Sequence, residues 1–132
     1  MRTLLSAVLI VFCSSCLFSC KKDETTSSAP LSLVGKWELR KSIGGVGGLT
    51  YIYPPGSKYT VNFTATDFVF YDSGFVSHNG TYSIIKDTTK TDPAYFLFYM
   101  NNDKYNLYLE KDRFIFWMEN PDTYYTTYER IQ

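Results

Sequence analysis

Residues 94–119 read AYFLFYMNNDKYNLYLEKDRFIFWME, and this stretch decides the fold class. It contains three segments rich in aromatic and aliphatic residues, at 94–100, 104–110 and 113–119. Short polar turns separate these segments, namely Asn101-Asn102-Asp103 and Lys111-Asp112. Tyr, Phe and Ile favour strands, and connections this short join neighbouring strands as antiparallel hairpins. The stretch therefore predicts a three-stranded antiparallel meander.

The same pattern continues along the rest of the chain. Further strands are expected at residues 36–42, 59–63, 68–71, 81–86 and 123–131, with short extended pieces at 49–53 and 75–78. Asp72-Ser73-Gly74 ends one strand, and the tight-turn dipeptide Asn79-Gly80 is expected to precede the strand at 81–86. Beyond the first 20 residues no segment sustains a 3.6-residue hydrophobic period, so no substantial helix is expected.

Eight main strands in one open sheet would leave two long unpaired edges. Closure into a barrel removes these edges, and eight strands enclose room for packed side chains or one small ligand. We therefore expect an all-β domain over residues 33–132, an eight-stranded antiparallel up-and-down barrel. Segments 94–100 and 113–119 are apolar on both faces. One face can fill the barrel, while the other is covered by the N-terminal segment, covered by a partner, or left partly exposed.

The first 20 residues resemble a bacterial lipoprotein signal. Arg2 precedes the apolar run 4–12, which is too short to span a bilayer as a helix. Leu17-Phe18-Ser19-Cys20 then resembles a lipobox, whose cysteine is acylated and becomes the new N-terminus. The resemblance implies a signal peptide over 1–19 and a membrane anchor of acyl chains, such as palmitate, on Cys20. The alternative is an ordinary signal peptide with incidental cysteines.

The segment after Cys20 predicts a tether. Lys21-Lys22-Asp23-Glu24 resembles the surface-export signal of Gram-negative bacteria that display lipoproteins on the outer leaflet. Residues 25–30 are small and polar, so residues 20–32 are expected to form a lipidated flexible linker. We expect an outer-membrane protein at the cell surface, with a periplasm-facing anchor as the alternative. The alternative for Lys21-Lys22-Asp23-Glu24 is a solvated charged tether with no role in export.

Two short motifs at the ends of the barrel segment resemble those of lipocalins. Gly35-Lys36-Trp37 begins the first strand, and Tyr128-Glu129-Arg130 ends the last. With Gly80-Thr81-Tyr82 between them, residues 31–132 are similar to small lipocalin-like lipoproteins of Gram-negative bacteria. The resemblance implies that Arg130 lies over Trp37 at the barrel end, where such a pair gains roughly 0.5–2 kcal/mol. The alternative is a core Trp37 and a solvated Arg130.

The sequence offers little that predicts catalysis. His78 is the only histidine, and all three cysteines lie in the first 20 residues. No metal site, cofactor or enzymatic activity is therefore expected. The glycine-rich segment 44–48 lacks the Lys-Ser/Thr ending of a phosphate loop and is expected at the barrel rim. The 13 basic and 13 acidic residues balance, which argues against a nucleic-acid partner. The weakest alternative is an enzyme that uses the carboxylates in the turns as catalytic acids.

The aromatic residues, with 12 Tyr and 10 Phe, are the feature that most suggests binding. We expect a non-enzymatic lipoprotein that binds a small apolar or amphipathic ligand inside the barrel. The alternative is a surface adhesion or assembly subunit that binds a protein or a glycan through exposed aromatic residues, and ordinary cross-strand packing also explains many of them. The candidate ligand-binding residues are Tyr59, Phe63, Phe70, Tyr95, Tyr99, Tyr105 and Phe116.

Overall fold

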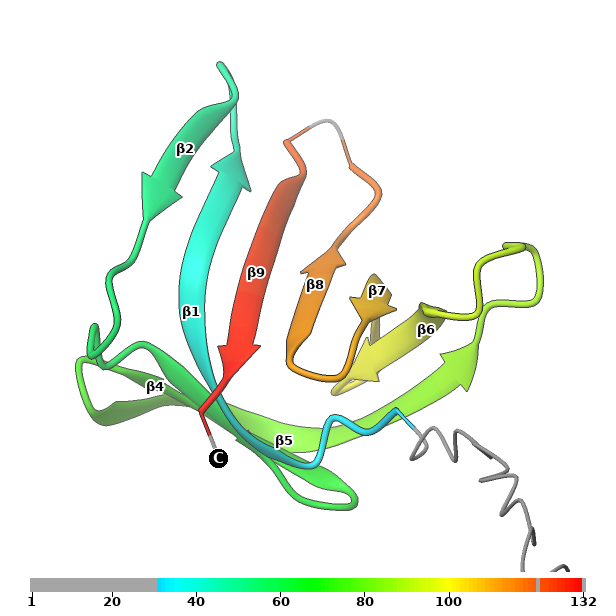
Figure 1. Ribbon diagram of the computed structural model, residues 1–132, viewed down its shortest axis with the longest axis horizontal. Coiled ribbons are helices and arrows are strands. Elements are labelled where there is room, and N and C mark those ends of the chain that lie inside the picture. The colour runs from blue at the N-terminus through cyan, green and yellow to red at the C-terminus, as the bar shows by residue number, and fades with distance from the viewer. Residues whose placement is uncertain (1–30, 121, 132) are drawn as a thin grey trace, which may run out of the picture.

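The computed structural model describes residues 31–120 and 122–131, which form a closed antiparallel β-barrel with one additional strand (Figure 1). The predicted all-β, eight-stranded barrel is confirmed, and no described residue is helical. The strands are β1 (Gly35–Gly44), β2 (Leu49–Ile52), β3 (Thr60–Phe63), β4 (Asp67–Asp72), β5 (Phe75–Lys86), β6 (Tyr95–Met100), β7 (Asp103–Leu109), β8 (Arg113–Trp117) and β9 (Tyr124–Arg130). Cys20, the signal peptide and most of the tether lie outside the described residues.

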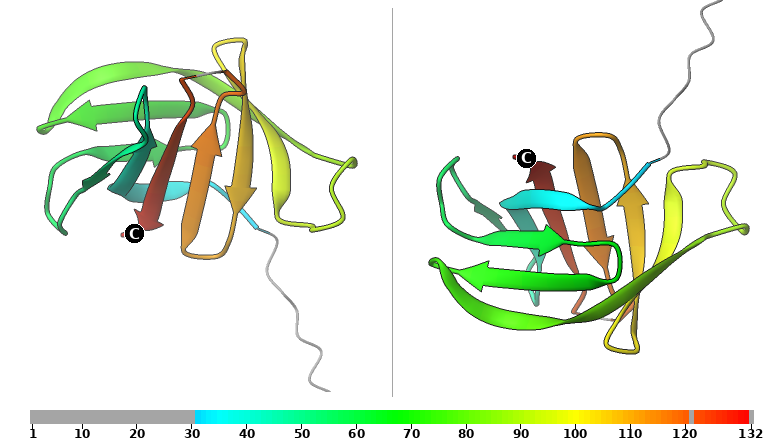
Figure 2. Two further views of the ribbon diagram at one scale, coloured as in Figure 1. Left: turned by 90° about the horizontal axis from the view of Figure 1, so that it is seen from above. Right: turned by 90° about the horizontal axis from the view of Figure 1, so that it is seen from below.

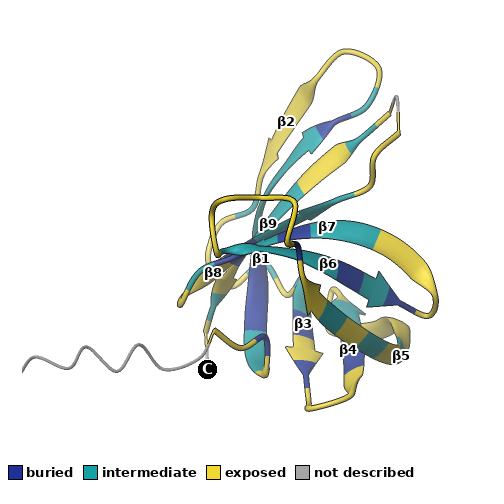
Figure 3. Cartoon of the chain, turned by 90° about the vertical axis from the view of Figure 1, so that its right-hand side faces the viewer, coloured by how far each residue is buried: buried dark blue, intermediate teal, exposed yellow. Residues whose placement is uncertain are grey.

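Strand β1 closes the barrel because it pairs along both of its edges. One edge pairs antiparallel with β9, from Trp37 opposite Arg130 to Gly44 opposite Tyr124. The other edge pairs with β3 in the first half of β1 and with β2 in its second half. From β3 to β9 each strand pairs with the next in sequence, so the sheet curls round on itself (Figure 2). The additional strand β2 is exposed along its length (Figure 3).

The predicted turn at Asn79-Gly80 is wrong, because β5 runs without interruption from Phe75 to Lys86. The hairpin turn lies earlier, at Ser73 and Gly74, whose φ angles of 54° and 90° suit a two-residue turn. At Gly80 a Cβ would lie 1.8 Å from Oδ1 of Asn101. Gly80 therefore makes room for a side chain from the β6–β7 turn.

Aromatic rings fill the barrel core. The buried apolar residues are Leu33, Trp37, Leu39, Val61, Phe63, Phe68, Phe98, Met100, Leu107, Leu109, Phe114 and Tyr128. Their alternation along the strands places odd-numbered residues of β3 and even-numbered residues of β6, β8 and β9 inside. Phe63 lies among rings from several strands, with its centroid 5.0 Å from that of Tyr82, 5.9 Å from Phe114 and 6.0 Å from Phe98.

Within residues 31–120 and 122–131 there is no helix with the length and apolar character to cross a membrane.

Candidate functional site

The first and last barrel strands bring Trp37 and Arg130 together. The two residues are register partners in the β1–β9 pairing. The guanidinium carbon of Arg130 lies 4.0 Å from the centroid of the Trp37 ring. The indole is fully buried, and its Nε1 donates a hydrogen bond to the carbonyl of Leu33 at 2.6 Å. The pair is a structural contact that joins β1 to β9.

Arg130 also holds the segment that leads into β1. Its guanidinium donates hydrogen bonds to the carbonyl oxygens of Ser32 at 2.6 Å and Val34 at 2.8 Å. Its Nε donates to the carbonyl of Lys111 at 3.1 Å, in the β7–β8 turn. A single side chain therefore ties the entering chain and this turn to the same end of the barrel, where it also covers the buried indole.

The structure divides the candidate ligand-binding residues into three groups. Phe63 is fully buried in the core. Tyr95 and Tyr99 do not line the interior, because the inward positions of β6 are occupied by Phe96, Phe98 and Met100. The remaining candidates are half-buried and pack against the core from its edge, namely Tyr59, Phe70, Tyr105 and Phe116.

The buried ring of Tyr128 contacts two of these half-buried rings, Phe70 and Phe116. Its ring stacks on Phe114 at 4.9 Å and on Phe116 at 6.0 Å, and Phe70 approaches it edge-on at 6.1 Å. Tyr105 contacts Phe116 at 5.6 Å. We call Tyr59, Phe70, Tyr105, Phe116 and Tyr128 the interior ring set.

Tyr128 and its neighbour Tyr53 belong to the tyrosine-rich strands from which a cavity lining is expected, but they are not among the seven candidate ligand-binding residues. The sequence does indicate the position of Tyr128. It lies two residues from Arg130 on the same strand, so both side chains lie on the face that also carries Trp37. Tyr53 follows β2 and contacts Tyr59 at 5.3 Å, a packing that no local periodicity indicates.

Two phenols of the interior ring set, those of Tyr105 and Tyr128, have raised pKa values and keep their protons. Burial raises the pKa of Tyr128 well above its ordinary value, with a smaller contribution from Tyr53. Burial also raises the pKa of Tyr105, assisted by the negative charge of Asp103. A neutral phenol offers both a donor and an acceptor beside its apolar ring. Tyr105 and Tyr128 therefore combine an apolar ring with an uncharged polar group.

A second group of rings lies on the outside of the barrel. Tyr95 of β6 contacts Tyr108 of β7 at 5.0 Å and Trp117 of β8 at 6.4 Å. Trp117 in turn stacks on Tyr125 of β9 at 5.5 Å. We call these four residues the outer aromatic ladder. Among the described residues, these side chains on the second apolar face of β6 and β8 pack on one another and are only partly covered.

His78 is the only histidine of the chain. His78 is exposed in β5, within 3.4 Å of the amide nitrogen of Asn101, and is not in a turn. Across residues 31–120 and 122–131, no group of three or more His, Cys, Asp and Glu side chains is placed to hold a metal ion.

These features define a closed antiparallel β-barrel with an aromatic interior and an aromatic outer face. Compared with protein family models, curated proteins and solved structures, the chain matches none.

Proposed function

We propose that this protein is a non-enzymatic, lipocalin-like lipoprotein of the outer membrane whose barrel binds a small apolar or amphipathic ligand. The observation that carries the proposal is the interior ring set, in which every ring except the buried Tyr128 is half-buried on the inner side of the barrel. Apolar surface that is still in contact with water gains about 25 cal/mol per Å² when a ligand covers it. The phenol groups of Tyr59 and Tyr105 add hydrogen-bonding groups for a polar end of such a ligand.

The packing of the core restricts where this ligand lies. Phe63, Phe98 and Phe114 are fully buried, and the ring of Phe63 contacts the other two, so this section of the barrel is occupied by protein. Phe70 and Phe116 are less covered and meet at Tyr128 from opposite walls, β4 and β8. We therefore place the ligand against these two rings.

Alanine at Phe116 is expected to weaken binding of dodecanoate, a fatty-acid probe, by about tenfold, the effect of losing roughly 1.4 kcal/mol of contact. Trp117→Ala is the matched control, because the adjacent residue on β8 points to the outer face. Calorimetric titration of each purified variant measures the affinity. Equal weakening by both changes, or by neither, would contradict an interior site.

The outer aromatic ladder supports a second function, a surface subunit that binds a protein or a glycan. Tyr95 and Tyr125 both pack against Trp117. These side chains combine an apolar ring with a polar group, which suits a binding surface that stays partly in contact with water. The variants Phe116→Ala and Trp117→Ala also separate the surface function from the interior ligand site. If the protein binds a partner through the outer aromatic ladder, Trp117→Ala is expected to remove that binding and Phe116→Ala to preserve it.

The anchor is proposed on Cys20, which lies outside the described residues. Cys20→Ala is expected to abolish incorporation of labelled palmitate and to leave uncleaved or mislocalised precursor, because the thiol that carries the acyl chains is gone. Cys16→Ala is the control and is expected to leave labelling unchanged. Labelling that survives Cys20→Ala contradicts the lipobox interpretation. Protease treatment of intact cells then distinguishes surface display from a periplasm-facing anchor.

A further inference from the structure

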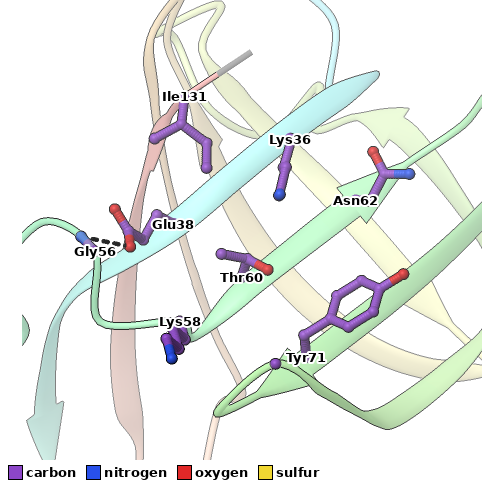
Figure 4. A pocket seen from close by; sticks show the side chains of 9 residues that line it. Lys36, Glu38, Gly56, Lys58, Thr60, Asn62, Tyr71 and Ile131 are labelled. Carbon is purple, nitrogen blue, oxygen red and sulfur yellow. Dashed lines mark hydrogen bonds between the residues drawn. The ribbon is translucent and has the colours of Figure 1, made fainter.

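A polar hollow of about 620 Å³ lies on the outer face of β1, β3 and β4 (Figure 4). Its volume falls within the roughly 300–1,000 Å³ of ligand pockets. It lies on the opposite face of β1 and β3 from the buried side chains of Trp37, Leu39, Val61 and Phe63, so it is separate from the barrel interior.

Strand register assembles the hollow from residues distant in sequence. Lys36 lies opposite Asn62, and Glu38 lies opposite Thr60, in the β1–β3 pairing. Thr60 in turn lies opposite Tyr71 in the β3–β4 pairing. Figure 4 shows Lys36, Thr60, Asn62 and Tyr71 on the same side of their strands. Cations, neutral hydrogen-bonding groups and an aromatic ring therefore share one concave surface.

The carboxylate of Glu38 organises one wall of the hollow and is already occupied. It is buried, and its Oε1 accepts a hydrogen bond from the backbone N–H of Gly56 at 2.8 Å. Its Oε2 forms an ion pair with Arg40, which also pairs with Glu129 at 3.1 Å. The register of β1 shifts at Arg40, as in a β-bulge. The loop carrying Gly56 and Lys58 is thus fastened to β1, and Arg40, which Glu38 shares with Glu129, offsets part of the negative charge of Glu38.

Lys36 and Lys58 bring two positive charges to the lining of the hollow. Among the described residues, neither forms an ion pair. Lys58 also has a φ of 65°, a left-handed conformation that is uncommon for a residue with a side chain. Hydrogen bonds from Ser57 to Pro54 and from Leu39 to Tyr59 hold the backbone on both sides of it. Conformations of this kind cluster at ligand-binding positions.

We propose that this hollow binds an acidic sugar, with its carboxylate between Lys36 and Lys58 and its ring against Tyr71. Two lysines attract one anionic group as mobile point charges, in contrast to the bidentate fork that arginine presents to phosphate. The hydroxyl of Thr60 and the amide of Asn62 supply the mixed donors and acceptors that sugar hydroxyls require. The half-buried ring of Tyr71 supplies an apolar face beside them. This site does not depend on a ligand inside the barrel.

The test is calorimetric titration of the purified protein with digalacturonate at low ionic strength. Galactobiose, its neutral counterpart, is expected to bind at least about tenfold more weakly, because it lacks the carboxylates that the lysines attract. Lys36→Gln and Lys58→Asn are each expected to weaken digalacturonate binding about fivefold. Asparagine is chosen at position 58 because it tolerates a positive φ.

Controls separate this site from general charge effects and from the barrel interior. Lys104→Gln removes the same charge from an exposed position of β7 and is expected to leave digalacturonate binding unchanged. Phe116→Ala, in the interior ring set, is expected to leave it unchanged as well. The proposal is overturned if galactobiose binds as tightly, if Lys104→Gln weakens binding as much as Lys36→Gln, or if inorganic phosphate displaces digalacturonate at equal concentration.

Discussion

Replacing Trp37 by alanine is expected to lower the free energy of unfolding by about 3–5 kcal/mol, the range for large-to-small changes of buried aromatic residues. The indole is fully buried and packs edge-on against Phe114 at a centroid distance of 5.0 Å. Its removal leaves a cavity beside Phe114 and deprives the carbonyl of Leu33 of its buried donor. Urea denaturation followed by far-ultraviolet circular dichroism measures the loss.

The contact with Arg130 makes this prediction more specific. Arg130→Ala is expected to cost less than Trp37→Ala, because the guanidinium is partly exposed and its losses are hydrogen bonds and stacking. In a double-mutant cycle the two changes are expected to couple by at least ~0.5 kcal/mol, since residues in contact are not additive. Lys104→Ala, on β7, is the control and is expected to be additive with Trp37→Ala. Strict additivity of Trp37→Ala and Arg130→Ala would contradict an energetic role for the stacked pair.

Much of the barrel follows from local patterns in the sequence. Alternation along Lys58–Phe63 predicts a strand with one buried face, and β3 has that face in Val61 and Phe63. The turn at Asn101-Asn102 is equally local, because both residues take the positive φ values of 48° and 76° that asparagine tolerates. Closure then follows from the number of strands and the need to remove free edges.

The incorrect turn at Asn79-Gly80 has a physical cause. Glycine serves a tight turn and a close approach between chain segments equally well, so the dipeptide alone does not distinguish them. The side chain of Asn101 lies against Gly80, accepts from the N–H of Thr81 at 3.2 Å and donates to the carbonyl of Asn79 at 3.2 Å. That contact spans some 20 residues of sequence, beyond the reach of any local rule.

The sequence also did not predict which face of β6 points into the barrel, nor the position of the polar hollow. Every residue from Tyr95 to Met100 is aromatic or aliphatic, so alternation does not say whether Tyr95 or Phe96 points inward. The pairing of Tyr95 with Tyr108 on the outer face decides it. The hollow depends likewise on register, because Lys36, Asn62 and Tyr71 by themselves look like the solvated positions of three unrelated strands.

Phe63→Ala is the other substitution with a large expected effect, again about 3–5 kcal/mol in the free energy of unfolding. The ring lies 5.0 Å from Tyr82, 5.9 Å from Phe114, 6.0 Å from Phe98 and 6.4 Å from Phe68, so it joins β3 to β4, β5, β6 and β8. Domains of this size are stable by only about 5–15 kcal/mol, so the variant retains a small margin or none. Asn62→Ala, the exposed neighbour on β3, is the matched control and is expected to stay within about 0.5 kcal/mol of the parent.

Phe63→Leu then separates a core role from a ligand-binding role. Leucine keeps an apolar side chain at this position, so the loss is expected to be smaller than for alanine and the barrel is expected to stay folded. Because Phe63 is fully buried, a ligand that covers only the interior ring set does not reach it. The folded Phe63→Leu variant is therefore expected to bind dodecanoate with the parent affinity, whereas Phe116→Ala weakens binding. Weakened binding in Phe63→Leu would instead place the ligand deeper, in contact with the core rings, and would contradict the division between a filled core and a binding edge.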